Sequence, residues 1–235
     1  MGNSFEQKKI LLTSGNSVFE VTVLQAESAT RCILFAAGFG GDPSRHLGLL
    51  QTFARHGISV VAPHFARLES AIPTKSELLE RSHRLALAVD EYCPQNMSIA
   101  GVGHSIGTVI LLMHVGAEAS TLTGEQLVFR GKKVLGRLVL FTPPTDFFRR
   151  SGSLVSVKVP IQIWAGGKDL LTPPAQAAFL KETLGAQTQV EMRVVEDAGH
   201  FTFMNELPPH VNDPHPERDA FLLSLSDEVR RFLTL

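Results

Sequence analysis

The sequence predicts an α/β fold in which a mostly parallel, doubly wound sheet follows an N-terminal antiparallel hairpin. Apolar runs alternate with helical patterns from residue 32 to the end, and two strand-like segments joined by a turn precede them. Strands that alternate with helices normally pair in parallel, because each helix carries the chain back across the sheet. The 235 residues suffice for one core, and we expect a single domain over 1–235.

The elements are expected in a regular order. Residues 7–14 and 17–26, separated by Gly15-Asn16, predict the hairpin. Residues 32–37 form a continuous apolar run, which is typical of a parallel strand covered on both faces. A helix capped by Asp42 or Ser44 follows, and Thr74 with Glu77 has the capping-box spacing that begins another. The remaining expected strands are 58–62, 97–102, 137–141, 160–165 and 189–195, and the remaining helices are 106–115, 174–184 and 217–233.

Composition and charge exclude several classes of protein. Lys and Arg total 22 against 23 Asp and Glu, and this balance argues against a nucleic-acid-binding or polybasic membrane surface. No apolar run approaches the ~18 residues of a membrane span, and no signal-peptide pattern follows Lys8-Lys9. Cys32 and Cys93 are expected to be reduced thiols, since two scattered cysteines are more typical of a cytosolic protein. We therefore expect a cytoplasmic protein, whose oligomeric state the sequence does not indicate.

Gly103-His104-Ser105-Ile106-Gly107 is a G-x-S-x-G pattern between an apolar strand and an apolar helix. A sharp turn from strand to helix exposes the serine hydroxyl, and the flanking glycines allow neighbouring backbone to approach. The N-terminus of the helix offers backbone N–H groups to a developing oxyanion. The pattern therefore predicts that Ser105 is a nucleophile.

Serine needs a base to take its proton, and the chain has nine histidines. His200, in Asp197-Ala198-Gly199-His200, alone is both late in the chain and directly after a predicted strand. His104 is expected to point to the other side of the serine turn. His210 and His215, with Asp213, match no defined metal-ligand spacing, so we expect a solvated loop there and no metal.

The imidazole in turn needs a carboxylate at its second nitrogen. Asp169 follows the predicted strand 160–165 and is our candidate. Asp146, which follows the preceding strand, is the alternative acid. Asp197 is too close to His200 in sequence.

These residues resemble the α/β-hydrolase superfamily over nearly the whole chain, since Ser105, Asp169 and His200 occur in its order of nucleophile, acid and base. The segments 163–173 and 197–201 are similar to its acid and histidine loops. The resemblance implies that the backbone N–H groups of Phe39 and Ile106 form the oxyanion hole. The sequence departs from the family at Ala37, where many members have histidine, and at Thr108, where a further glycine is frequent. It is more loosely similar to small dienelactone-hydrolase-like members, and those with a cysteine nucleophile differ at position 105.

The resemblance implies a hydrolase that cleaves a small or medium carboxylic ester or thioester through an acyl-enzyme, with no cofactor. Fewer than twenty residues separate the strands that end near Phe141 and begin near Pro160, so no large cap domain is expected. Residues 118–136 are expected to form either a small flap or an extra edge strand. Phe65, Phe147 and Phe201 are candidates to line the substrate pocket. An acyltransferase or cofactor-free perhydrolase with the same triad, and a catalytically silent binding protein, are the alternatives.

Overall fold

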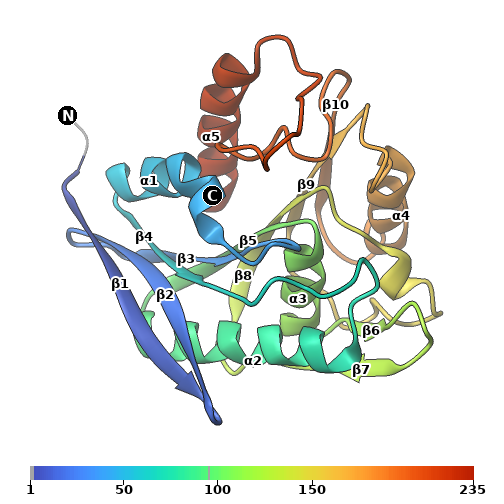
Figure 1. Cartoon of the computed structure of the whole chain (residues 1–235), viewed down its shortest axis with the longest axis horizontal. Coiled ribbons are helices and arrows are strands. Elements are labelled where there is room, and N and C mark those ends of the chain that lie inside the picture. The colour runs from blue at the N-terminus through green and yellow to red at the C-terminus, as the bar shows by residue number, and fades with distance from the viewer. Residues whose placement is uncertain (1–2, 95) are drawn as a thin grey trace.

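The computed structural model describes residues 3–94 and 96–235, and an eight-stranded sheet runs through its centre (Figure 1). The order of the strands across the sheet is β1-β2-β4-β3-β5-β8-β9-β10. The strands are β1 (Phe5–Ser14), β2 (Ser17–Ala26), β3 (Arg31–Ala36), β4 (Ile58–Pro63), β5 (Ser98–His104), β8 (Leu135–Phe141), β9 (Ile161–Gly166) and β10 (Val190–Val195). The helices are α1 (Leu47–Arg55), α2 (Lys75–Tyr92), α3 (Ile106–His114), α4 (Pro174–Leu184) and α5 (Arg218–Thr234).

The pairing of the strands confirms the predicted topology. β1 and β2 form an antiparallel hairpin, and β2 joins the sheet antiparallel to β4. The pairs from β4 through β3, β5, β8 and β9 to β10 are all parallel. The carboxyl ends of these parallel strands therefore meet at one edge of the sheet, where ligands bind in open α/β folds.

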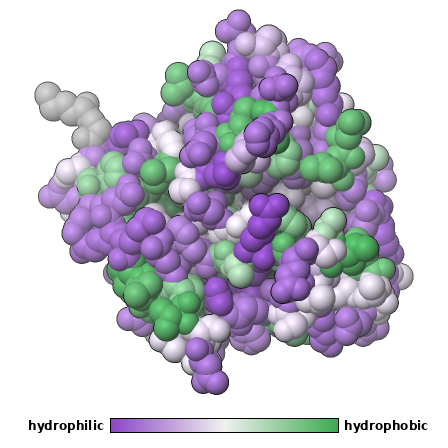
Figure 2. All heavy atoms as spheres, viewed as in Figure 1, coloured by the Kyte–Doolittle hydropathy of each residue, from purple (hydrophilic) through white to green (hydrophobic). Residues whose placement is uncertain are grey.

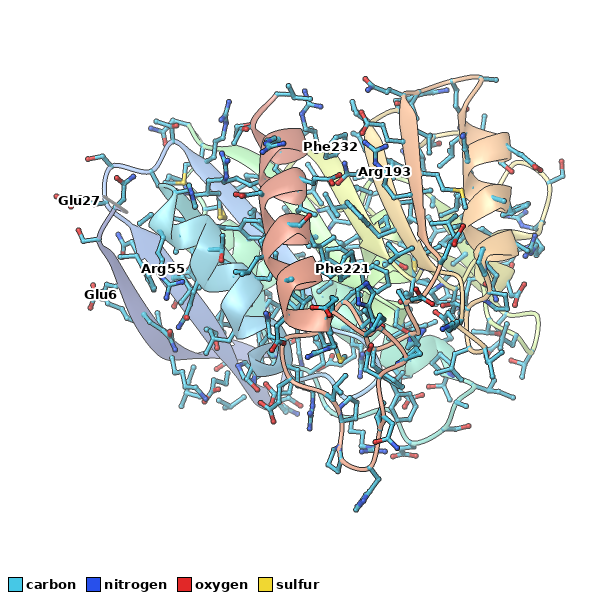
Figure 3. The ribbon with its side chains drawn as sticks, turned by 90° about the horizontal axis from the view of Figure 1, so that it is seen from above. Glu6, Glu27, Arg55, Arg193, Phe221 and Phe232 are labelled. Atoms are coloured by element: carbon cyan, nitrogen blue, oxygen red, sulfur yellow. A yellow bond between two sulfur atoms is a disulfide. The ribbon has the colours of Figure 1, made fainter. Side chains whose placement is uncertain are left out.

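Helices cover both faces of the sheet, and their apolar sides pack against its apolar side chains. α1 and α5 pack together on one face, α2 and α3 pack together on the other, and α4 lies beside β9 and β10 (Figure 1). Every residue of α3 is buried, which explains why this helix is apolar all round. Phe221 and Phe232 lie along α5 on the side that faces the sheet (Figure 3). The capping box predicted at Thr74 and Glu77 begins α2.

Two connections lie at the carboxyl edge of the sheet and could cover it. Between β8 and β9 the chain forms only a short 3-10 helix, Asp146–Phe148, so the expected lack of a large cap agrees with the structure. Within residues 118–136, β6 (Glu118–Ser120) and β7 (Gln126–Val128) form a separate two-stranded sheet. The segment is therefore a small hairpin, and the expectation of an extra edge strand in the main sheet is wrong.

The prediction of reduced thiols is also wrong, since Cys32 and Cys93 form a disulfide. Cys32 pairs with Ile99 across β3 and β5, and Cys93 caps the C-terminus of α2, which ends beside these strands. Parallel pairing thus brings together two residues that are 61 positions apart. The prediction of a cytoplasmic protein relied in part on reduced thiols, and disulfides are rare in cytosolic proteins, so this bond removes that support.

The surface is mostly hydrophilic on the face seen in Figure 1, and its hydrophobic atoms lie in several separate patches (Figure 2). Among the helices of the described residues, none has the length and hydropathy needed to cross a bilayer.

Candidate active site

Ser105 lies in the turn between β5 and α3, with backbone angles of φ 52° and ψ −126°. A positive φ is costly for a residue with a side chain, and it persists here because the surroundings fix it. The Ser105 N–H donates to the carbonyl of Phe141 at 2.9 Å. At Gly107 an added Cβ would lie 2.1 Å from the carbonyl oxygen of Ala36, so only glycine allows α3 to approach β3 this closely. The turn has the geometry that the sequence pattern predicts.

The structure brings Ser105, His200 and Asp169 into one chain of contacts. The His200 Nε2 lies 3.0 Å from the Ser105 Oγ, and its Nδ1 lies 2.8 Å from the Asp169 Oδ2. The three residues follow β5, β10 and β9 respectively. Because the carboxylate accepts a hydrogen bond from the Nδ1–H group, the proton of the neutral ring lies on Nδ1, and Nε2 has a lone pair that faces the serine hydroxyl. This is the arrangement that activates a serine.

The Asp169 carboxylate is almost fully buried and is held by more than the histidine. Its Oδ1 accepts from the backbone N–H groups of Leu171 and Thr172, each at 2.8 Å, and its Oδ2 accepts from the Thr172 hydroxyl at 2.7 Å. Burial raises the pKa of Asp169, but the hydrogen bond and charge of His200 and the bonds from Thr172 outweigh it, and the net pKa lies below the ordinary value. The acid therefore stays ionised at neutral pH.

Sequence reasoning missed Thr172, whose hydroxyl also lies 3.1 Å from the His200 Nδ1. A threonine three residues after a loop aspartate is a common turn pattern. This spacing was the only feature of the sequence that pointed to a role for Thr172 beside Asp169.

The two other carboxylates considered from the sequence lie elsewhere. Asp146 is exposed, accepts from the Arg149 Nε at 3.1 Å, and forms no hydrogen bond or ion pair with His200 in the described residues. Asp197 is exposed and pairs with Lys168 at 2.7 Å. The geometry therefore favours Asp169 as the acid.

The segment that carries Phe39 is shaped by a buried cation that sequence reasoning did not identify. The Arg81 guanidinium, from α2, donates to the carbonyls of Gly38, Phe39 and Ala66 at 2.7, 3.0 and 2.6 Å. Burial lowers the pKa of Arg81 to about 10, so it remains charged at neutral pH. In the described part of the chain, the backbone N–H groups of Phe39 and Ile106 donate no hydrogen bond. Both are therefore available to a ligand beside Ser105.

A cavity of about 610 Å³ opens beside Ser105 and His200. Phe39, Phe147 and Phe201 line it, together with apolar groups such as Leu68, Leu122 and Met204. Phe65 is not among the lining residues, because it is turned inward, where the Arg81 guanidinium lies 5.1 Å from its ring centroid. The volume is typical of sites for small molecules.

Comparisons with known proteins give no relative by sequence but clear likeness by structure. No protein-family model matches the chain, and no curated protein matches it. An esterase from Pyrococcus furiosus superposes with a TM-score of 0.67 and 15% identity, over 98% of this chain and 92% of that one. A dienelactone hydrolase from Anabaena variabilis gives 0.68 and 15%, over 98% and 97%. Esterase 2 from Thermogutta terrifontis, phosphorylated by paraoxon, gives 0.67 and 14%, over 95% and 92%. The chain has the α/β-hydrolase fold.

Within this α/β-hydrolase fold, three histidine rings lie in a row behind the serine turn. The ring centroids of His46 and His104, and of His104 and His200, are each 5.1 Å apart. The His104 Nε2 lies 2.9 Å from the carbonyl of His200, which can only accept, so this nitrogen carries the proton. Burial lowers the pKa of His104 well below its usual value, and the ring is neutral. His104 therefore ties the serine turn to the backbone of the loop that carries His200.

The loop after His200 is tied to the segment that precedes α5. The Thr202 hydroxyl accepts from the Gly199 N–H at 2.8 Å and donates to the Asp213 Oδ1 at 3.0 Å. Asp213 also accepts from the His215 N–H, and Arg218 lies 3.6 Å from its other oxygen. Across residues 3–94 and 96–235, no group of His, Cys, Asp and Glu has the arrangement of a metal site. The Asp213 carboxylate therefore links the loop after His200 to the segment before α5 through the Thr202 hydroxyl.

Proposed function

We propose that this protein is a serine hydrolase that cleaves a small or medium carboxylic ester or thioester through an acyl-enzyme on Ser105. The observation that carries the proposal is the continuous chain from the Ser105 Oγ to the His200 Nε2 at 3.0 Å and from the His200 Nδ1 to Asp169 at 2.8 Å, at the wall of a cavity of about 610 Å³. Acyl transfer by a serine, a histidine and an aspartate requires no cofactor.

In the first half-reaction the Ser105 Oγ adds to the carbonyl carbon of the substrate while the His200 Nε2 takes the hydroxyl proton. The carbonyl oxygen becomes an oxyanion, and the free N–H groups of Phe39 and Ile106 stabilise it. Each such donor contributes on the order of 2.7–4 kcal/mol. Collapse of the intermediate breaks the bond to the alcohol or thiol, which leaves with the proton from His200.

In the second half-reaction a water molecule replaces the alcohol. His200 takes one proton of the water as its oxygen attacks the acyl carbonyl, and returns that proton to the Ser105 Oγ as the ester bond breaks. Asp169 stays ionised throughout and stabilises the imidazolium, in agreement with its lowered pKa. The products are a carboxylic acid and the free enzyme.

The structural neighbours support the same reaction class. Two of them are esterases and one is a dienelactone hydrolase. The phosphorylation of the Thermogutta terrifontis enzyme by paraoxon suggests a probe for this chain as well.

The first experiment is labelling with a fluorophosphonate, beside Ser105→Ala, with the adduct located by peptide mass spectrometry. We expect one adduct on Ser105 that the variant lacks, and turnover of p-nitrophenyl esters or acyl thioesters. A folded protein that is not labelled would contradict the proposal and favour a silent binding protein. A labelled protein that transfers the acyl group to added alcohol or peroxide faster than to water would be an acyltransferase or perhydrolase.

A pair of matched variants tests the acid. Asp169→Asn removes the charge that faces the His200 Nδ1 and should lower kcat about 10³–10⁴-fold, as loss of the buried triad carboxylate does elsewhere. Asp146→Asn removes an exposed carboxylate from the same cavity wall and should change kcat less than about threefold. The opposite ranking would assign the acid to Asp146.

A further inference from the structure

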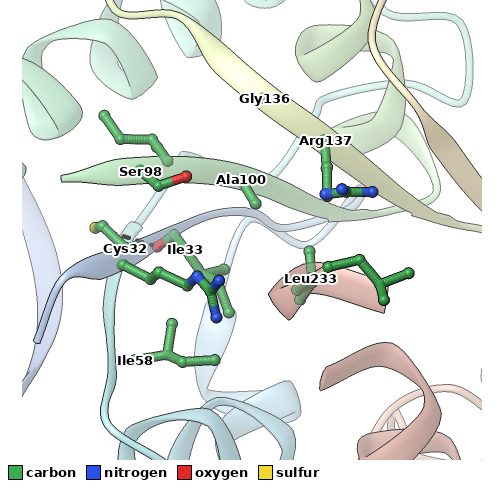
Figure 4. Close-up of a pocket in the computed structure, with 11 residues that line it drawn as sticks. Cys32, Ile33, Ile58, Ser98, Ala100, Gly136, Arg137 and Leu233 are labelled. Atoms are coloured by element: carbon green, nitrogen blue, oxygen red, sulfur yellow. Dashed lines mark hydrogen bonds between the residues drawn. The ribbon is translucent and has the colours of Figure 1, made fainter. Parts of the chain in front are cut away.

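A second cavity, of about 180 Å³, lies at the opposite edge of the sheet, where the parallel strands begin. Figure 4 shows Cys32 and Ile33 of β3 on one side, Ala100 of β5 in the middle, and Arg137 of β8 on the other side, with Leu233 of α5 facing them. Its polar side chains are those of Arg31, Ser98 and Arg137. Leu235, the last residue described, also lines the cavity, and its carboxylate forms no ion pair with either arginine in the described structure.

The register of the strands explains why two arginines share this cavity. Arg31 pairs with Ser98, and Arg137 pairs with Ala100, two residues farther along β5. Residues two apart on a strand lie on the same face, so both arginines extend from one face of the sheet, on either side of β5. The pairing of β5 with β8 shifts between Ile99 and Ala100, which leaves Gly136 unpaired. A bulge of this kind redirects the following side chain, here Arg137.

Neither guanidinium has an anionic partner. Within residues 3–94 and 96–235, Arg31 and Arg137 form no ion pair and no hydrogen bond through their side chains. Arg137 is instead positioned by packing, with its Cζ 5.5 Å from the ring centroid of Phe232. Both side chains are half-buried. Two positive charges beside one small, partly apolar cavity repel each other, and an anion between them would relieve that repulsion.

We propose that this cavity is a binding site for a small phosphate-type oxyanion, held by Arg31 and Arg137. Guanidinium groups donate in pairs to tetrahedral oxyanions, and the Ser98 hydroxyl supplies a third donor on the same face. The volume suits a group of the size of inorganic phosphate and is below the ~300 Å³ of pockets for larger organic ligands. Ala100, between the arginines, leaves room that a larger side chain would fill. This site is independent of the proposed esterase activity.

The test is isothermal titration of the full chain with inorganic phosphate, with ionic strength held constant by sodium chloride. We expect binding to one site and a loss of at least about tenfold in affinity on Arg31→Gln, because one charged pair of donors is removed. Arg137→Gln should act in the same way. Arg137→Lys, which keeps the charge but not the paired donors, should bind with intermediate affinity.

Arg193→Gln is the matched control, since it removes one positive charge from β10, where Arg193 faces Glu228, and leaves the cavity unchanged. Thermal melts of each variant without phosphate show whether it is folded. If Arg137→Gln unfolds because it loses its contact with Phe232, Arg31→Gln still tests the proposal. No heat of binding to the wild-type protein would overturn the proposal. Binding that Arg31→Gln does not weaken would also overturn it, because the anion would then lie elsewhere, the cavity beside Ser105 included.

Discussion

Replacing His46 by leucine should remove part of the acid sensitivity of folding. His46 is fully buried against Phe35 and His104, and in the described structure neither ring nitrogen has a hydrogen-bond partner. Burial, aided by the charge of Arg45 and opposed by Asp42, lowers its pKa from 6.5 to about 3. The ring is therefore neutral in the folded protein down to low pH, whereas in the unfolded chain it takes up a proton near pH 6.5.

The magnitude follows from this difference in proton uptake. A depressed folded-state pKa contributes stability that is present above pH 6.5 and is lost as the pH falls toward 3. With these two pKa values, lowering the pH from 7 to 5 costs about 2 kcal/mol of unfolding free energy through His46 alone. The His46→Leu variant should lack this loss, while burial, the main cause of the lowered pKa of His104, is present in both proteins.

Urea denaturation at pH 7 and pH 5 measures the effect. The difference in unfolding free energy between the two pH values should be smaller by about 2 kcal/mol in His46→Leu than in the wild type. Phe35→Leu is the matched control, because it weakens packing against the same ring and removes no titratable group. Parallel pH dependence in the wild type and His46→Leu would refute the reasoning.

Three further outcomes are expected. Thr172→Val removes one hydrogen bond from the triad carboxylate and should lower kcat about fivefold to tenfold with little change in KM; steady-state kinetics on an ester check this, and an unchanged kcat would contradict it. Replacing Cys32 and Cys93 together by alanine should lower the unfolding free energy by about 2–4 kcal/mol, since the disulfide closes a loop of 61 residues, and equal denaturation midpoints would argue against the bond. Gly107→Ala should yield little folded protein, because the new methyl group would meet backbone at 2.1 Å, and normal expression with a wild-type melting temperature would show that α3 can shift.

Strand-end position was the most informative signal in the sequence. The predicted strands 97–102, 160–165 and 189–195 end within two residues of the observed β5, β9 and β10. Because parallel strands end at one edge, it follows that Ser105, Asp169 and His200 lie close together, and they do. Their catalytic roles stay a proposal.

What the sequence could not predict depends on distances across the fold. Arg81 sits in an amphipathic helix, where an arginine is normally solvated; it is buried here because three carbonyls converge on it. Phe65 and Phe39 both follow strands, yet only Phe39 reaches the cavity, since the chain turns Phe65 under Arg81. The disulfide likewise depends on the lateral order of strands, which spacing alone does not give.

The β6–β7 hairpin is the part of the cavity wall that is freest to vary in sequence. Leu122, in its connecting turn, is half exposed and lines the cavity beside Ser105, while the hairpin itself belongs to no part of the main sheet. Buried Ala119 and Leu127 anchor the two strands of the hairpin, whereas Leu122 in its turn is exposed. The turn therefore tolerates substitution more readily than the buried strand ends that carry Ser105, Asp169 and His200. Under the proposed function, substitutions at the hairpin turn would change the wall of the cavity and leave the alignment of Ser105, His200 and Asp169 undisturbed.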